Sequence, residues 1–248
     1  DFNRVRADMF TARIEHDLKP GVTLRNVSRF GRTEQQYVLT GVNAVTASGG
    51  TAVPADPATW TVSRSRQGKD QENKILTNQT SVNAEFATGE FKHSLVSGVE
   101  FIYEKQTNAT QGAVAGQVTD PANLYNPSTG DRSASVGPTG ARTSGSTVTA
   151  ALYAFDTLKL SEQWLLNGGL RWEKYKTTTD AITLSTATAQ PGLPVGTPLG
   201  TSLAKADDLL TWKIGAVFKP ASNGSVYVGY STSEKPPGGG SLTLHAPR

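Results

Sequence analysis

The sequence predicts an all-β fold, a transmembrane antiparallel up-and-down β-barrel, because its 248 residues alternate between strand-like runs and two kinds of connection. Tight turns join the runs in pairs, and the intervening links are long and rich in Gly, Ser, Thr and Pro. Short turns on one side and long loops on the other are typical of outer-membrane barrels. A soluble β-sandwich has little reason to separate its loops by length. The turns are expected at Lys19-Pro20-Gly21, Thr88-Gly89-Glu90, Leu160-Ser161-Glu162 and Ser222-Asn223-Gly224, and the long loops at residues 39–68, 108–145 and 177–206.

About eight strands are expected, and each should have an apolar and a polar face because successive side chains of a strand point to opposite sides. The alternation is clear in the first, second and fourth strands and weaker in the third. The apolar faces of these four strands are Phe10, Ala12, Ile14 and Leu18; Val22, Leu24 and Phe30; Leu76, Val82, Ala84 and Phe86; and Phe91, Leu95, Val99, Phe101 and Tyr103.

The fifth strand, residues 148–160, carries apolar residues on both faces, so the pattern does not decide which face is which. The last three strands alternate clearly. Their apolar faces are Trp164, Leu166, Leu170 and Trp172; Leu210, Trp212, Ile214 and Phe218; and Val226, Val228 and Tyr230.

Strand length and aromatic placement both favour a membrane. The runs last roughly 12 to 16 residues, whereas soluble strands have about 5 or 6 and a tilted bilayer crossing needs about 9 to 11. Aromatic residues lie at both ends of an apolar face, as in Phe91 with Tyr103 and Trp164 with Trp172. This placement suits two interfacial girdles. The alternative is a soluble sandwich whose aromatic residues pack in a core.

The polar faces carry charges that a dry core would not tolerate unpaired. We expect these charges to face a water-filled lumen or a polar filling. The side chains of an eight-stranded barrel already fill its interior, so this many long charged groups favours a wider barrel. The expected lumen-facing residues are Arg13, Arg25, Arg29, Glu100, Arg171, Glu173 and Lys213.

Composition and motifs argue against several other classes. The formal net charge is +3 and there is no cysteine, so nothing indicates a nucleic-acid partner or a disulfide. No apolar run is long enough for a membrane-spanning helix. No export signal precedes Asp1, so any such segment is expected to lie outside the printed sequence.

We expect no catalytic residue, no metal site and no enzyme activity. No nucleophile elbow or phosphate-binding loop is present. Of the three histidines, His16 and His93 are expected on apolar faces near the short turns, where they are more plausible as interfacial residues than as catalytic ones. No set of His with Asp or Ser is apparent in the sequence.

Two stretches, ALYAFDTLKL at residues 151–160 and WLLNGGLRW at residues 164–172, resemble a strand–turn–strand signature of TonB-dependent outer-membrane receptors. Other stretches are similar to the siderophore branch, in particular its catecholate members. They are LTNQT at residues 76–80 with FKHSLVSGVEF at residues 91–101, and FKP at residues 218–220 with GSVYVGYS at residues 224–231. The similarity covers nearly all of the strand regions and fades in the loops.

This resemblance implies a larger protein, with a barrel of 22 strands and an N-terminal plug domain inside it. Residues 1–248 would then form a partial barrel domain, and the plug domain is absent from this chain. The implied function is TonB-coupled uptake of a ferric siderophore across the bacterial outer membrane. The implied partners are the ferric siderophore, the TonB complex (through the missing plug) and outer-membrane lipid. No cofactor is implied, because the siderophore itself carries the iron.

The long loops are the expected ligand-binding region. A ferric tris-catecholate complex is anionic and aromatic, so arginine can meet its charge and stack on its rings, and Tyr or Trp can add further stacking. For any single loop residue, simple solvation is the alternative. The candidates are Tyr37, Trp60, Arg64, Arg66, Tyr125, Arg132 and Arg142.

Three alternatives stay open at this point. The receptor could take another cargo, such as heme or cobalamin. The chain could be a small self-contained barrel that acts as an adhesin or structural anchor, in which case its first and last strands would pair. It could also be an outer-membrane enzyme, which the missing catalytic set disfavours.

Overall fold

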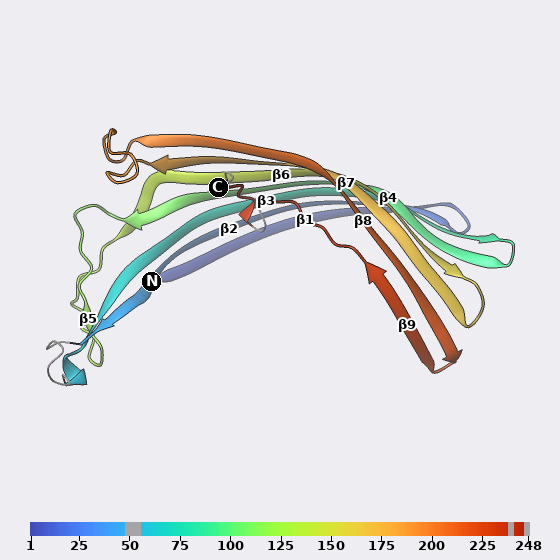
Figure 1. Cartoon of the computed structure of the whole chain (residues 1–248), viewed down its shortest axis with the longest axis horizontal. Coiled ribbons are helices and arrows are strands. Elements are labelled where there is room, and N and C mark those ends of the chain that lie inside the picture. Colours follow the sequence, from blue (N-terminus) through green and yellow to red (C-terminus); the bar gives the residue numbers. More distant parts are fainter. Residues whose placement is uncertain (48–55, 238–240, 246–248) are drawn as a thin grey trace.

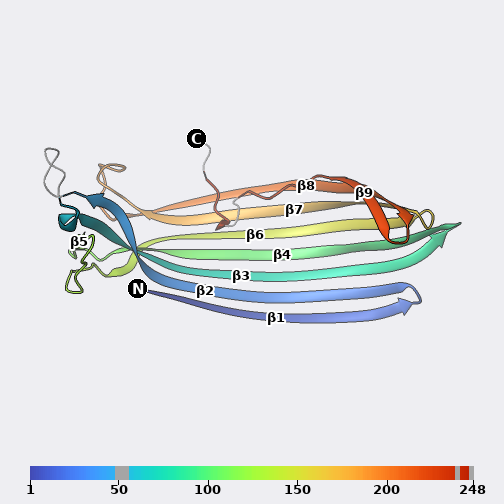
Figure 2. The same ribbon diagram turned by 90° about the horizontal axis from the view of Figure 1, so that it is seen from below.

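The computed structural model describes residues 1–47, 56–237 and 241–245. In these residues the chain forms one arched antiparallel sheet (Figure 1). The long strands lie side by side in the order β1-β2-β3-β4-β6-β7-β8-β9, and the two-residue strand β5 pairs with β3 outside this path (Figure 2). The elements are β1 Phe2–Lys19, β2 Val22–Thr46, the 3-10 helix η1 Pro57–Thr59, β3 Thr61–Thr88, β4 Phe91–Ala113, β5 Ala122–Asn123, β6 Val136–Lys159, β7 Trp164–Leu184, β8 Pro198–Ala221 and β9 Gly224–Ser231.

All four predicted tight turns are confirmed, and they lie together at one end of the sheet, here called the short-turn end (Figure 1). Gly21 and Gly89 adopt φ values of +76° and +62°, a conformation in which glycine carries no steric penalty. The long connections lie at the opposite, long-loop end, where the structure describes residues 56–60 of the first, 114–135 of the second and 185–197 of the third. The predicted segregation of connections by length is therefore present.

The predicted loop boundaries were wrong, because the strands continue well into them. β2 has 25 residues and β3 has 28, so both exceed the expected strand length. In these extensions apolar and polar residues no longer alternate: Leu39 and Val42 of β2 fall on opposite faces, and residues 61–68 of β3 contain one apolar side chain, Val62. Backbone hydrogen bonds do not require apolar side chains. The pairing of β2 with β3 therefore continues beyond the residues whose hydrophobic pattern marks a strand.

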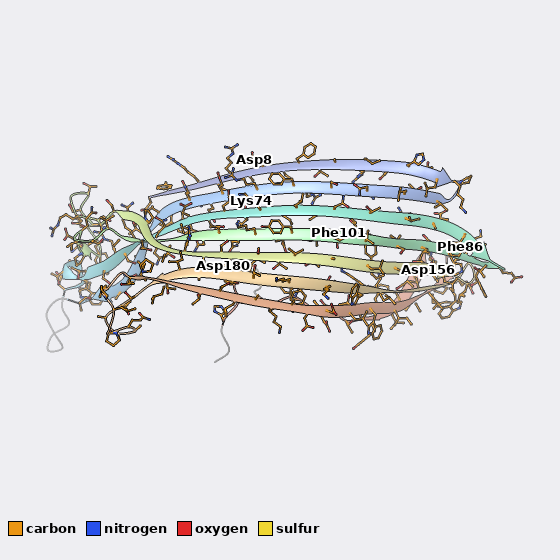
Figure 3. The ribbon with its side chains drawn as sticks, turned by 90° about the horizontal axis from the view of Figure 1, so that it is seen from above. Asp8, Lys74, Phe86, Phe101, Asp156 and Asp180 are labelled. Atoms are coloured by element: carbon orange, nitrogen blue, oxygen red, sulfur yellow. The ribbon has the colours of Figure 1, made fainter. Side chains whose placement is uncertain are left out.

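The register of the sheet confirms the predicted facing of the strands. Cross-strand partners share a face, and one row of partners runs from Val99 through Leu152 and Trp172 to Leu210. The face that bears this row is here called the outer face. Its side chains are open, with Leu152 53% and Trp172 43% exposed, and Figure 3 labels Phe86 and Phe101 on it.

The opposite face, here called the lumen face, is polar and crowded. Thr147 is 3% exposed and its partner Thr177 is fully buried, and residues 241–245 lie on this face next to them, where the backbone N–H of Leu244 donates to Thr179 Oγ1 at 2.9 Å. Such crowding is expected on the inside of a curved sheet, where neighbouring side chains converge. A soluble sandwich buries its apolar face, so the observed distribution contradicts that alternative.

The structure decides the facing of the fifth predicted strand, β6. Val148 and Leu152 belong to the outer face, and Thr149 and Tyr153 belong to the lumen face. Tyr153 is 6% exposed, and its hydroxyl accepts a hydrogen bond from Gln79 Nε2 at 2.7 Å. Both faces of β6 therefore look apolar in the sequence because a buried tyrosine lies on the polar side.

Aromatic residues border the apolar part of the outer face at both ends. Near the short turns, Trp164 packs against Phe218 with ring centroids 4.6 Å apart. Towards the long loops, Phe10 pairs with Phe30, and Tyr103 lies in the same row. The two expected girdles are thus present on this part of the sheet.

The sheet is open. In the described residues, β1 and β9 occupy opposite edges and do not pair with each other, which contradicts a self-contained eight-stranded barrel. Unpaired backbone groups cannot face lipid, so a membrane-bound sheet of this kind needs further strands at both edges. None of the described helices combines the length and the apolar character needed to cross a membrane.

The facing of the strands can be tested with an added charge. We expect Leu152→Arg in the intact protein to lower the free energy of unfolding in lipid vesicles by about 2 to 4 kcal/mol, because position 152 faces the middle of the apolar belt. Gln36→Arg, on the same face but above the belt, should cost about 1 kcal/mol or less. Equal costs in a denaturant titration would show that the outer face is not in hydrocarbon.

Candidate functional site

All seven predicted lumen residues share the lumen face. Arg25 and Arg171 belong to one row of partners that passes through Ser81, Gly98 and Tyr153. The next row towards the long loops contains Arg13, Glu100 and Glu173. The remaining predicted residues, Arg29 and Lys213, occupy two other rows of the same face.

Arg171 is the centre of an ion-pair network that crosses three strands. Its Nη2 lies 2.7 Å from Glu100 Oε2 on β4, and its Nε lies 2.8 Å from Glu173 Oε2 on β7. All three side chains are no more than 24% exposed, so solvent screens these pairs less than it screens surface pairs. The network ties β4 to β7 across β6.

A basic groove lies beside this network on the lumen face, and it is lined by Arg13, Arg25, Arg29, Gln79, Ser81 and Tyr153. Arg25 Nε is 3.2 Å from Glu15 Oε1, and Arg29 Nε donates to Thr11 Oγ1 at 3.4 Å. On β8, Lys213 Nζ lies over the ring of Phe155 at 4.6 Å from its centroid. The groove therefore offers cationic groups that a polar filling or an anionic solute can contact.

At the long-loop end, the first two long connections pack into one unit. β5 pairs with the start of β3, and Asn123 Nδ2 donates to the carbonyl oxygen of Ala58 at 2.7 Å. The backbone N–H of Leu124 donates to the carbonyl oxygen of Trp60 at 2.8 Å. Because Leu124 precedes Tyr125 in the chain, these backbone contacts place two predicted ligand residues, Trp60 and Tyr125, near each other although they come from different connections.

Arg132 already has a carboxylate partner. Its Nε and Nη2 each donate a hydrogen bond to the Asp120 carboxylate at 3.0 Å, and its backbone N–H donates a third at 3.0 Å. The side-chain bonds from Arg132, followed by the backbone bond, hold the pKa of Asp120 below its usual value. Asp120 therefore stays ionised at neutral pH, and the charge of Arg132 is compensated.

Arg64 is engaged in the same loop. Its Nη2 donates to the carbonyl oxygen of Asp120 at 2.9 Å and lies 3.3 Å from Asp131 Oδ2. The two arginines thus hold residues 120–132 in place. By contrast, Tyr125 is 68% exposed and its ring is open to a ligand.

Four of the seven ligand candidates lie on strands, so their assignment to loops was wrong. Tyr37 is in β2, where it pairs with Asn3 and Lys69 on the lumen face. Arg64 and Arg66 are in β3, and Arg66 Nη2 lies 3.6 Å from Asp1 Oδ1. Arg142 is in β6 on the outer face, in the row of Ala109 and Ile182. Ligand binding by any of the seven stays a prediction.

Sequence reasoning missed the partners of these residues. Nothing in the pattern singled out Asp120 or Asp131, because they are 56 and 67 residues from Arg64 and a single sequence does not report such contacts. Tyr153 was missed because β6 has no clear polar face. Its cross-strand pairing with Arg171 would have placed it on the lumen face.

One His–Asp pair exists that the sequence did not reveal. His93 Nδ1 lies 2.6 Å from Asp156 Oδ2, and the imidazole stacks on Phe86 with ring centroids 4.6 Å apart. The pair lies on the outer face near the short-turn end, where Figure 3 labels Asp156 and Phe86. Within the described residues, no serine contacts this His–Asp pair. The same residues contain no cluster of three or more His, Cys, Asp or Glu side chains that could hold a metal ion.

The network around Arg171 predicts strong energetic coupling. We expect a double-mutant cycle of Glu100→Gln and Arg171→Gln in the intact protein to give a coupling free energy of about 1 to 3 kcal/mol, since the pair is partly buried. The exposed Lys159–Glu162 pair is the control: at 2.6 Å it is shorter, yet its coupling should be much weaker because solvent screens it. Similar coupling in both cycles, measured by denaturant unfolding, would contradict a shielded lumen face.

Comparison with known proteins adds independent information. Residues 1–246 match the family model described as TonB dependent receptor-like, beta-barrel. The chain is 38% identical to the catecholate siderophore receptor Fiu of Escherichia coli K12 over 98% of its length. It is 30% identical, over 91% of its length, to the probable TonB-dependent receptor BfrD of Bordetella pertussis Tohama I. The chain spans 32% and 30% of the lengths of these relatives.

The fold is also that of a solved receptor. The structure aligns with the closed form of the ferric-catecholate import receptor Fiu from E. coli K12 with a TM-score of 0.87 and 35% identity. The alignment covers 98% of this chain and 35% of that one. The receptor PiuA from Acinetobacter baumannii aligns with a TM-score of 0.70 at 20% identity, which supports the fold alone. The chain therefore belongs to the β-barrel family of TonB-dependent receptors.

Proposed function

We propose that this chain is the barrel-wall segment of a TonB-coupled receptor that takes up a ferric siderophore across the bacterial outer membrane. The observation that carries the proposal is the 38% identity to a catecholate siderophore receptor, which extends over 98% of this chain. The two-faced sheet supports it, since an apolar outer face and a charged lumen face suit a wall between lipid and a polar passage.

In this proposal the chain contributes no chemistry of its own. Residues 1–248 form part of the barrel domain, and a plug domain from elsewhere in the receptor fills the lumen. TonB acts through that plug. The side chains of the Arg171 network and the basic groove contact the plug and the solute that passes it. The iron is cargo held by the siderophore, so the protein supplies no resident metal or cofactor.

The long-loop end is the proposed capture site. Trp60 and Tyr125 offer aromatic faces from two loops that pack together, which suits an aromatic ligand. Arg64 and Arg132 lie in the same unit, and their charges are held by Asp131 and Asp120. An anionic complex would compete with these carboxylates for the guanidinium groups, and catecholate rings could stack on them.

The proposal is tested by cargo binding to the full-length receptor. Quenching of tryptophan fluorescence should show tighter binding of a ferric tris-catecholate than of a ferric hydroxamate or heme. Tight binding of heme alone would overturn the siderophore assignment. Hydrolysis of lipid or peptide that depends on His93 would overturn the view that the protein is not an enzyme.

The capture site makes a specific prediction. Trp60→Ala and Tyr125→Ala should each weaken ferric catecholate binding about tenfold, because each removes one stacking surface. Phe101→Leu removes an aromatic ring from the outer face and should leave the affinity unchanged. Affinities that are equal for all three variants would show that the cargo does not bind at this loop unit.

A further inference from the structure

The outer face changes character above the apolar belt. The last apolar row on the β1–β6 side runs through Phe10, Phe30, Leu76, Tyr103 and Val148. The next rows towards the long loops carry charged residues on the same face, and Figure 3 labels Asp8, Lys74 and Asp180 among them. These rows lie where the hydrocarbon ends and the headgroups begin.

Over β1 to β3, three of the four cations of this charged zone form ion pairs within the protein, and the fourth, Arg4, lies over the ring of Phe2 at 5.3 Å from its centroid. Arg6 Nε is 2.9 Å from Asp8 Oδ2, and Lys74 Nζ is 2.7 Å from Glu72 Oε1. Arg32 donates from Nε to Glu72 Oε2 at 2.7 Å and also contacts Glu34. Four carboxylates on the same face match these four cations in number: Asp8, Glu34, Asp70 and Glu72.

Over β4, β6 and β7, the corresponding cations have no carboxylate partner among the described residues. They are Lys105, Arg142 and Lys176, and all three are exposed. The nearby carboxylate, Asp180, accepts a hydrogen bond from Ser202 at 2.7 Å and makes no ion pair within the described part of the chain. Three cations against one carboxylate give this sector a net charge of +2. No further carboxylate that the structure describes in this sector compensates that charge.

Hydroxyl groups lie between these cations. Ser146 Oγ is 2.9 Å from Thr178 Oγ1, and Thr107 Oγ1 is 3.4 Å from Ser144 Oγ. A shallow groove opens here on the outer face, lined by Lys105, Thr107, Arg142, Ser144, Asp180 and Ser202. Hydroxyl donors beside unpaired cations suit a tetrahedral oxyanion such as a phosphate group.

The depth of the sector points to the source of that phosphate. Lys176 occupies the same row as Tyr103 and Val148, at the upper border of the apolar belt. Trp172 lies two rows lower on β7, in the row of Leu152 within the apolar belt. An anion that meets these cations therefore lies directly above acyl chains that cover the belt.

We propose that Lys105, Arg142 and Lys176 bind the phosphate groups of a phosphorylated lipid in the outer leaflet. The chain thereby has a lipid-binding sector over β4–β7 and a self-neutralised sector over β1–β3. This inference rests on the outer-membrane location proposed above. It is separate from cargo capture, because the sector lies on the face opposite the lumen.

The test uses the full-length receptor in neutral detergent micelles and bisphosphorylated lipid A as the probe, with retained lipid counted by native mass spectrometry. Lys105→Gln/Lys176→Gln should reduce retention about tenfold or more, since each surface cation contributes to the attraction of an anionic lipid. The matched control is Arg6→Gln/Lys74→Gln, which removes two cations from the paired sector, Lys74 in the row of Lys105 and Arg6 one row nearer the long loops. It should leave retention unchanged.

Equal retention in the two double variants would overturn the proposal. Complete displacement of the lipid by millimolar inorganic phosphate would also overturn it, because the sector would then be a free-anion site. Ferric catecholate binding, measured on the same samples, separates this proposal from the function. If no siderophore binds but lipid retention still depends on Lys105 and Lys176, the proposed siderophore function is contradicted and the proposed lipid site is supported.

Discussion

The structure depends on one constraint: a strand in hydrocarbon must pair all its backbone N–H and C=O groups while sending alternate side chains into two different solvents. The sheet meets the first demand with an almost unbroken ladder from β1 to β9, whose few register shifts include one between Val42 and Ala44. It meets the second with an outer face of open apolar side chains such as Leu152 and a lumen face of polar ones such as Thr177. Pleating alone converts this requirement into the period-2 pattern of the sequence.

The two faces divide the work of the proposed receptor. On the lumen face, charges are retained because partners satisfy them, as Arg171 does with Glu100 and Glu173. On the outer face, charges are concentrated in the rows above the apolar belt, and within the belt Lys174 lies opposite Asp208 and His93 contacts Asp156. Above the belt, the paired cations over β1–β3 need no external anion, whereas Lys105 and Lys176 over β4–β7 do. The loop unit that carries Trp60 and Tyr125 lies at the long-loop end of the sheet, and the hydrogen bonds from Arg132 to Asp120 stabilise it.

The sequence predicted the strands, the turns and the facing of seven long strands, because each of these leaves a local periodic signal. It could not define the strand ends, since β2 and β6 continue without a regular alternation of apolar and polar residues, and Tyr37 and Arg142 were therefore misplaced in loops. It could not define pairing across long separations either. Asp120 compensates Arg132 and Asp131 compensates Arg64, and both contacts depend on how the loops pack. The His93–Asp156 pair was missed for the same reason. Its two residues belong to different strands, and only the register between β4 and β6 brings them together.

The most direct test of the account is the solvent around two adjacent residues of β8. The chain has no cysteine, so Leu210→Cys and Thr211→Cys can each carry a single spin label in a cysteine-free receptor in bilayers. Leu210 lies on the outer face and Thr211 on the lumen face, so oxygen should relax the label at 210 more strongly and a water-soluble nickel complex the label at 211. The same accessibility at both positions would contradict a sheet that separates lipid from an aqueous lumen.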